Sequence, residues 1–188
     1  MAEQLPLPMK RDLFFTKQVD QASIGELTQR VIEINKDDDH LKKVYSIYNL
    51  NYEPAPIKIY IDSYGGYVYQ CFGLLSVIER SQTPVHTIVT GCAMSCGFMM
   101  LICGHKRFAH RLSTPLYHQV SSGAFGTLKE MEEKIEETKR LQAQLEDIVK
   151  EKTSISKKKL KEIFDNKKDW YMTAEEALEL SVIDEILK

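Results

Sequence analysis

The spacing of apolar residues along the chain alternates between the two-residue period of strands and the longer period of helices. Residues 22–35 place four apolar residues on one face, which predicts an amphipathic helix. Residues 57–62, IKIYID, predict a strand. The turn SYGGY follows, and residues 68–81 return to helical spacing. A strand, a glycine turn and a helix therefore form one predicted unit.

The same unit is repeated directly afterwards. Residues 84–90, PVHTIVT, predict a strand, GCAMSCG predicts the next turn, and residues 98–104 predict the next helix. Such crossovers favour parallel strands with functional groups at their carboxyl ends. We therefore expect one α/β domain over residues 1–188. Further strands are predicted at 12–16, 106–110, 116–120 and 181–187.

The C-terminal third is predicted to be mostly helical. Residues 127–152 form a long amphipathic pattern, in which Glu130 and Lys134, and Glu136 and Arg140, have the spacing of favourable ion pairs. Most charged residues of this helix are therefore expected to lie on a solvent-exposed face.

Two short helices should follow the long one. The first covers residues 154–164 and could be capped by Ser154 or Ser156. The second, at residues 173–180, begins with Thr173 and Glu176 in capping-box spacing.

Composition excludes several function classes. The 188 residues are 43% hydrophobic and carry a formal net charge of -2, without the basic excess that nucleic-acid binding needs. The start of the chain has no apolar signal region, and no apolar run reaches membrane-span length. Four cysteines without a CxxC pair suit a reducing compartment, so we expect a cytoplasmic protein.

No metal or cofactor is expected. Cys92 and Cys96 lack the second His or Cys pair of a zinc finger, and the acidic run KDDDH is typical of a solvated loop rather than a cation site. The sequence also lacks a GxxxxGK[ST] phosphate loop, so any ATP would belong to a partner.

Ser95 is the candidate nucleophile. It follows a predicted strand, lies in a turn of small residues and opens a helix, as an activated serine would. The alternative is an ordinary helix N-cap. Composition does not choose a general base among the five histidines, which are His40, His86, His105, His110 and His118.

Four segments together resemble the ClpP family, the proteolytic subunits of Clp proteases. They are IYIDSYGGYVYQCFGLLSVI, GCAMSCGFMMLICGHKRF, YHQVSSG and DWYMTAEEALELSVIDEIL. The resemblance runs from about Arg11 to the C-terminus. It implies the ClpP/crotonase-like fold, with repeated strand-turn-helix units and a long handle helix, and it implies a serine endopeptidase.

The resemblance assigns the catalytic roles. The family's Gly-x-Ala-x-Ser-x-Gly motif is matched around Ser95, and its His-Gln pair is matched by His118 and Gln119. Asp169 occupies the place of the catalytic aspartate, with Asp165 as a nearby competitor. Ser95 would attack the peptide carbonyl, His118 would transfer the proton, and Asp169 would orient the imidazole.

The resemblance also implies the rest of the binding site. The backbone N–H groups of Gly66 and Cys96 would form the oxyanion hole. An extended peptide would add a strand between two segments. The implied substrate-binding residues are Tyr67, Val68, Tyr69, Ser121, Ser122, Gly123 and Phe125.

An oligomeric chamber is implied as well. A handle strand and helix at residues 121–152 would join two heptameric rings of identical subunits into a tetradecamer that hydrolyses unfolded polypeptides. The segment at residues 1–10 is shorter than the family's axial gating segment, so docking of an AAA+ unfoldase is left open. Residues 36–56 are longer than the family's usual link and predict an extra surface element.

Some positions depart from the family pattern. Tyr64 replaces a proline, Met94 replaces a small residue, and VSSG replaces a glycine pair after His-Gln. Two other functions therefore stay open: a crotonase-type acyl-CoA enzyme, and a non-catalytic ring protein. Acylation of Ser95 would distinguish the peptidase from both.

Overall fold

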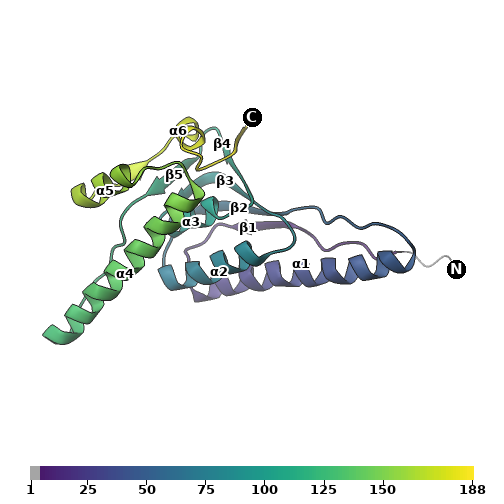
Figure 1. Cartoon of the computed structure of the whole chain (residues 1–188), viewed down its shortest axis with the longest axis horizontal. Coiled ribbons are helices and arrows are strands. Elements are labelled where there is room, and N and C mark those ends of the chain that lie inside the picture. Colours follow the sequence, from purple (N-terminus) through teal and green to yellow (C-terminus); the bar gives the residue numbers. More distant parts are fainter. Residues whose placement is uncertain (1–4) are drawn as a thin grey trace.

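A mainly parallel sheet forms the centre of the structure, a computed structural model that describes residues 5–188 (Figure 1). Residues 1–4 of the predicted N-terminal segment lie outside the described residues. Within the described part, seven strands join one sheet, five of them in the order β1-β2-β3-β4-β7, while β5 pairs with β3 and β6. The strands are β1 (Asp12–Phe15), β2 (Ile57–Ser63), β3 (Val85–Met94), β4 (Lys106–His110), β5 (Thr114–Tyr117), β6 (Trp170–Tyr171) and β7 (Glu185–Leu187).

The long strand β3 changes its neighbour halfway along. Its first half, residues 86–89, pairs with β4, whereas residues 92–94 pair with β5, and both pairings are parallel. The carboxyl ends of β3 and β5 therefore lie side by side. The residues that follow β5 are thus brought next to the residues that follow β3.

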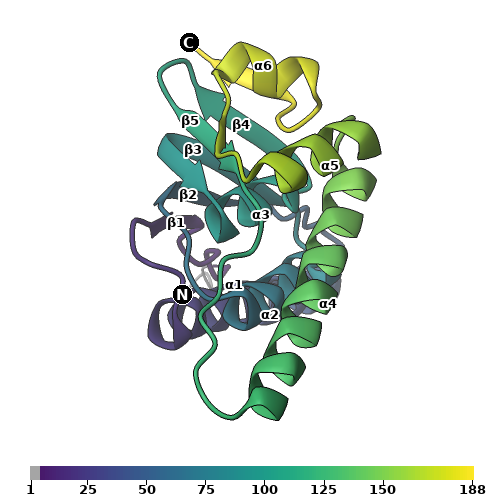
Figure 2. The ribbon, with the colours of Figure 1, turned by 90° about the vertical axis from the view of Figure 1, so that its left-hand side faces the viewer.

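Helices cover the sheet. Figures 1 and 2 show α1 and α2 side by side against one face, while α4 runs past the sheet and projects beyond it. Fully buried side chains from the sheet, α1, α2 and α3 form one core, including Ile34, Ile59, Leu74 and Phe98. The helices are α1 (Gln21–Ile47), α2 (Val68–Arg80), α3 (Cys96–Ile102), α4 (Leu128–Lys152), α5 (Lys157–Asn166) and α6 (Ala174–Glu179).

Helix α1 is much longer than predicted. Asp20 caps its start by accepting a hydrogen bond from the Ser23 N–H, and the helix continues through KDDDH to Ile47. The extra element predicted at residues 36–56 is therefore the last turns of α1 and the segment that returns to β2.

A buried ion pair explains this extension. Asp38 is 1% exposed and accepts two hydrogen bonds from the guanidinium group of Arg11, together with one from Tyr52 and one from Thr83. The carboxylate that looked solvated in the sequence is thus neutralised inside the protein. No cluster of three His, Cys, Asp or Glu side chains suited to a metal ion occurs among residues 5–188.

The helix caps follow the predictions, but the ion pairs on α4 do not. Ser156, rather than Ser154, caps α5, and the capping box at α6 is formed. Glu130 caps its own helix through Thr127 instead of pairing with Lys134. Arg140 pairs with Glu137, which also accepts the hydroxyl of Tyr69.

Strand predictions near the C-terminal half were only partly correct. The strand expected at 116–120 ends at Tyr117. Residues 118–127 pair with no other strand within the described chain, so the handle strand stays a prediction. The strand expected at 181–187 is limited to β7, and β6 was not predicted.

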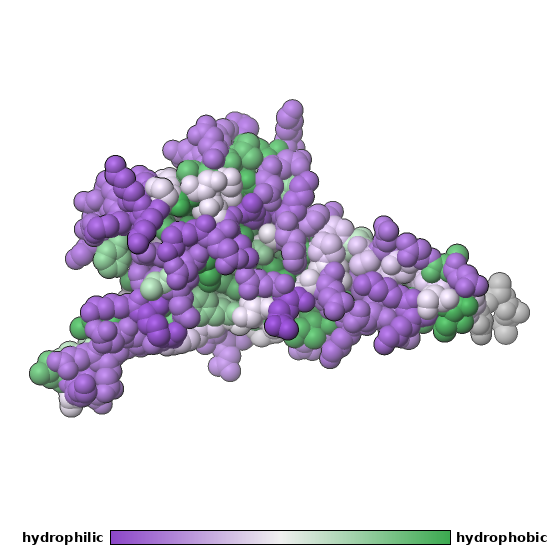
Figure 3. Space-filling model, viewed as in Figure 1, coloured by the Kyte–Doolittle hydropathy of each residue, from purple (hydrophilic) through white to green (hydrophobic). Residues whose placement is uncertain are grey.

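Apolar side chains are exposed at the free end of α4. Leu128 is 71% exposed, Phe125 is fully exposed and Ile135 is half-exposed, whereas Leu145 and Val149 near the other end are buried. Figure 3 shows apolar atoms at this projecting end on an otherwise mostly hydrophilic face. Only the C-terminal half of α4 therefore packs on its own domain. No helix among residues 5–188 is long and apolar enough to cross a membrane.

Candidate active site

Ser95 lies on a sharp turn between β3 and α3. Its backbone has φ 54° and ψ -119°, a left-handed conformation that is costly for a residue with a side chain. Its N–H donates to the carbonyl of Leu116 in β5 over 3.0 Å, which holds the turn against the neighbouring strand. The Ser95 hydroxyl makes no capping hydrogen bond to α3. Ser95 therefore occupies the N-cap position of α3, but its hydroxyl does not cap the helix.

The glycines around Ser95 are needed for close packing. A Cβ atom on Gly91 would lie 2.5 Å from the carboxylate of Asp62, which accepts a hydrogen bond from the Cys92 N–H. A Cβ atom on Gly97 would lie 2.9 Å from the Ser63 carbonyl oxygen. Both glycines let β3 and α3 approach β2 closely, so their spacing around Ser95 has a structural cause.

Gly65 brings the preceding glycine turn against Ser95. Its φ is +93°, and a Cβ atom there would lie 2.6 Å from the Met94 oxygen and 2.7 Å from the Ser95 Cβ. We expect Gly65→Ala to lower the free energy of unfolding by about 1–3 kcal/mol and to displace the Ser95 turn. Chemical denaturation checks this prediction. Gly123→Ala, where a Cβ meets open space, is the matched control and should change stability little.

Ser95 and His118 line the same pocket. His118 follows β5 directly, so the pairing of β5 with the end of β3 brings it beside Ser95. Gly66, Cys96 and Gln119 also line this pocket. Among the described residues, no hydrogen bond joins Ser95 to His118, so the two side chains share a pocket without being bonded.

Asp169 directly precedes β6, as His118 directly follows β5. β5 and β6 pair antiparallel with Tyr117 opposite Trp170, and this register extended by one position would set His118 opposite Asp169. No hydrogen bond between these two side chains occurs in the described structure. The competitor Asp165 belongs to the exposed face of α5, where it binds Lys161 over 2.7 Å. The strand register thus favours Asp169 over Asp165.

Two backbone N–H groups are available at this pocket. Gly66 forms a bridge with Val19 that uses the Gly65 carbonyl and the Tyr67 N–H, which leaves the Gly66 N–H outside the bridge. Cys96 occupies the first position of α3, where helices leave N–H groups without an intrahelical partner. Both predicted oxyanion donors therefore border the pocket that contains Ser95.

The predicted substrate-binding residues are not all equivalent. Val68 and Ser121 line the pocket, whereas Tyr67, Tyr69 and Phe125 are exposed beyond it. Ser122 bonds Thr138 of α4, and Gly123 lies in the exposed segment before that helix.

Sequence reasoning missed several pocket residues. Met99, Tyr117 and Leu145 supply apolar walls, and Val120 completes the side next to His118. Helical or strand periodicity marks such residues only as core, so the sequence contains no signal that would separate them from other buried side chains.

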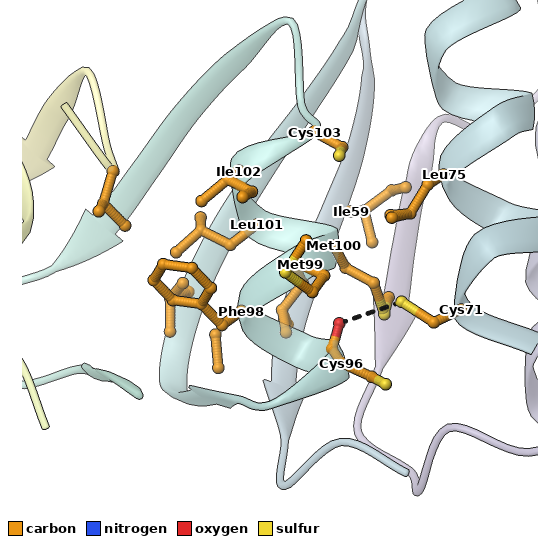
Figure 4. Packing of buried hydrophobic residues seen from close by; sticks show 14 of the residues in the cluster. Ile59, Cys71, Leu75, Cys96, Phe98, Met99, Met100, Leu101, Ile102 and Cys103 are labelled. Atoms are coloured by element: carbon orange, nitrogen blue, oxygen red, sulfur yellow. Dashed lines mark hydrogen bonds between the residues drawn. The ribbon is translucent and has the colours of Figure 1, made fainter. Parts of the chain in front are cut away.

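The cysteines have a packing role near Ser95. All four are buried and free. The Cys96 thiol donates to the Gly66 carbonyl over 3.3 Å, and the Cys71 thiol donates to the Cys96 carbonyl over 3.5 Å (Figure 4). Hydrogen bonding to Cys96 and burial raise the pKa of the Cys71 thiol. These contacts tie α2, α3 and the glycine turn together.

Comparison with known proteins identifies the family. The family model of the Clp protease matches residues 7–188. The chain therefore belongs to the Clp protease family, as the sequence motifs predicted, and the parallel sheet with its covering helices is consistent with that family's fold.

Individual relatives agree with this assignment. An ATP-dependent Clp protease proteolytic subunit of Deinococcus radiodurans is 34% identical over 70% of this chain and 64% of that protein, so the match spans just under two thirds of that relative. A subunit with the same description from Bacteroides fragilis is 30% identical over 96% of this chain and 81% of its own. Proteolytic subunit 2 of Treponema pallidum is 30% identical over 83% of this chain and 79% of its own.

Proposed function

We propose that this protein is a serine endopeptidase in which Ser95 is the nucleophile, His118 the general base and Asp169 the residue that orients His118. One observation carries the proposal: Ser95, on a sharp turn and with its hydroxyl free of any capping bond, lines the same pocket as His118. The names of the relatives, all proteolytic subunits of Clp proteases, support the same activity.

The reaction would proceed by acyl transfer. The Ser95 Oγ attacks the scissile carbonyl carbon while His118 accepts its proton, and the oxyanion receives hydrogen bonds from the N–H groups of Gly66 and Cys96. His118 then donates the proton to the leaving amine, which breaks the peptide bond and leaves an acyl ester on Ser95. A water molecule, deprotonated by His118, attacks this ester; the acid product leaves, and His118 returns the proton to the Ser95 oxygen.

In this proposal, the three catalytic side chains must come closer together before the reaction can start. Hydrogen bonds between catalytic groups are often long in a free enzyme and tighten when substrate binds. Ser95, His118 and Asp169 lie at the carboxyl ends of β3 and β5 and at the start of β6, so a small movement of the segment after β5 would adjust the distances between them.

The substrate would be an extended, unfolded polypeptide. Backbone hydrogen bonds to residues 67–69 and 121–125 would hold it as an added strand, which tolerates many sequences. Residues 121–125 have no strand partner within the described chain, which supports such pairing.

Assembly would enclose the site. In this proposal the exposed apolar end of α4, with residues 121–127, is the handle that joins two heptameric rings of identical subunits. An AAA+ unfoldase is a possible partner that would supply unfolded substrate, and the complex would act in the cytoplasm. The whole of residues 1–188 would form one peptidase domain.

Labelling with a serine-directed fluorophosphonate tests the proposed nucleophile. Intact-mass spectrometry should find one adduct per chain, and peptide mapping should assign it to Ser95. Ser122→Ala, which changes another serine near the pocket, should label normally. Absence of an adduct in folded protein would contradict the peptidase proposal and favour the acyl-CoA enzyme or the non-catalytic ring protein.

A further inference from the structure

Gln142 is an unusual residue in the buried part of α4. It is 8% exposed and lies next to the buried Leu141, with Leu145 and Val149 one and two turns further on. Burial of an amide side chain costs free energy unless hydrogen bonds replace those made with water. A leucine would serve equally well for packing, so the role of Gln142 must lie in its hydrogen bonds.

Those hydrogen bonds hold the chain on both sides of His118. The Gln142 Oε1 accepts the Val120 N–H over 2.7 Å, and its Nε2 donates to the Tyr117 hydroxyl over 3.4 Å. The same Nε2 also donates to Glu146 over 2.8 Å, one turn along α4, which fixes the orientation of the amide. One side chain thus binds the residue before His118 and the residue two positions after it.

Tyr117 extends this connection to the helix that follows Ser95. Its ring packs against Phe98 of α3, with ring centroids 5.7 Å apart at an angle of 58°. Burial and the nearby Glu146 raise the pKa of Tyr117 to about 12, so its hydroxyl stays protonated at neutral pH. Gln142 therefore contacts a residue that packs on the helix starting after Ser95.

The backbone near His118 has few other anchors. β5 ends at Tyr117, and residues 118–127 form no strand. A segment without ladder hydrogen bonds depends on individual contacts for its position. The bond from Val120 to Gln142 is such a contact, and it comes from a helix rather than from the sheet.

We propose that Gln142 is a positioning residue that sets the orientation of His118 relative to Ser95. The inference deepens the proposed function and rests on its assignment of His118 as the general base. Gln142 itself touches neither the substrate nor the reacting atoms; it acts by fixing the segment from Tyr117 to Val120.

The first test measures Ser95 labelling in Gln142 variants. Gln142→Leu keeps the packing volume but removes the hydrogen bonds to Val120, Tyr117 and Glu146. It should lower the rate of fluorophosphonate labelling per folded molecule by about ten- to a hundredfold. Gln142→Glu combined with Glu146→Gln keeps the acceptor for the Val120 N–H and the amide-carboxylate pairing between the two positions, and it should retain more activity than Gln142→Leu. Gln144→Leu is the same substitution on the exposed side of the helix and should label at the wild-type rate.

A second measurement follows His118 directly and does not depend on catalysis. The imidazole NMR chemical shifts of His118 should change in Gln142→Leu but not in Gln144→Leu. If wild-type protein fails to label while His118 still shifts, the triad proposal is wrong and the positioning role stands. If His118 is unchanged in Gln142→Leu, or that variant labels at the wild-type rate, the positioning role is overturned.

Discussion

Replacement of Ser95 with alanine should lower the hydrolysis of an unfolded protein substrate about a millionfold, the loss expected when the nucleophile of a serine peptidase is removed. The hydroxyl caps no helix and lies in the turn at the end of β3. Its removal therefore takes away the attacking oxygen without removing a stabilising capping bond. Release of labelled peptides from a fluorescent unfolded substrate measures the effect.

The fold should survive this substitution. Alanine meets the same positive φ as serine at this position, so the strain in the turn is unchanged, and the Ser95 N–H can still donate to Leu116. Thermal unfolding should therefore be close to that of the wild type. Residual hydrolysis at a substantial fraction of the wild-type rate in purified Ser95→Ala would show that another residue is the nucleophile.

Breaking the ion pair between Arg11 and Asp38 should destabilise the protein by about 3–5 kcal/mol, because each single substitution leaves the other charge buried without its partner. Arg11→Met leaves the carboxylate of Asp38 buried, and Asp38→Ala leaves the guanidinium group buried beside the hydroxyl of Tyr52. Urea unfolding measures both variants. The double variant should cost much less than the sum of the two, since no buried charge is left over.

An exposed ion pair provides the comparison. Lys161 and Asp165 on α5 are 72% and 51% exposed, and Lys161→Met should change stability by less than about 1 kcal/mol. Equal losses in Lys161→Met and Arg11→Met would contradict the role assigned to burial.

The same pair makes stability depend on pH. Burial raises the pKa of Asp38, but hydrogen bonds from Arg11, Thr83 and Tyr52 outweigh burial and leave the pKa below its usual value. The unfolded chain therefore takes up a proton at a higher pH than the folded protein does. The stability from this group is present above the ordinary aspartate pKa of about 4 and is lost as the pH falls through the folded-state value. Asp38→Ala should lack this part of the acid dependence.

The repeated strand-turn-helix units could be predicted because local patterns determine them. β2, α2, β3 and α3 each have a clear apolar period, and the glycine turns between them require backbone that few other residues adopt. The long α1 could not be predicted, because the partner that neutralises Asp38 lies far away in sequence at Arg11. β6 has two residues, too few for any period to be visible.

The candidate site also combines features that local sequence patterns predict with features that depend on distant contacts. The turn at Ser95 was predicted from small residues between a strand and a helix, but its backbone angles depend on the tertiary contact with Leu116. The roles of His118 and Asp169 came from the family resemblance and stay predictions. The sequence did not single out Gln142, and only the packing of α4 against the segment after β5 shows what its amide binds.

The order of the elements along the chain also sets the order in which the proposed site is completed during synthesis. A ribosome would release Ser95 and His118, which follow β3 and β5, well before it releases Asp169 and the short strand that pairs with β5. A growing chain therefore contains the proposed nucleophile and general base without the carboxylate that would orient the base. In this proposal, peptidase activity would be acquired only late in synthesis.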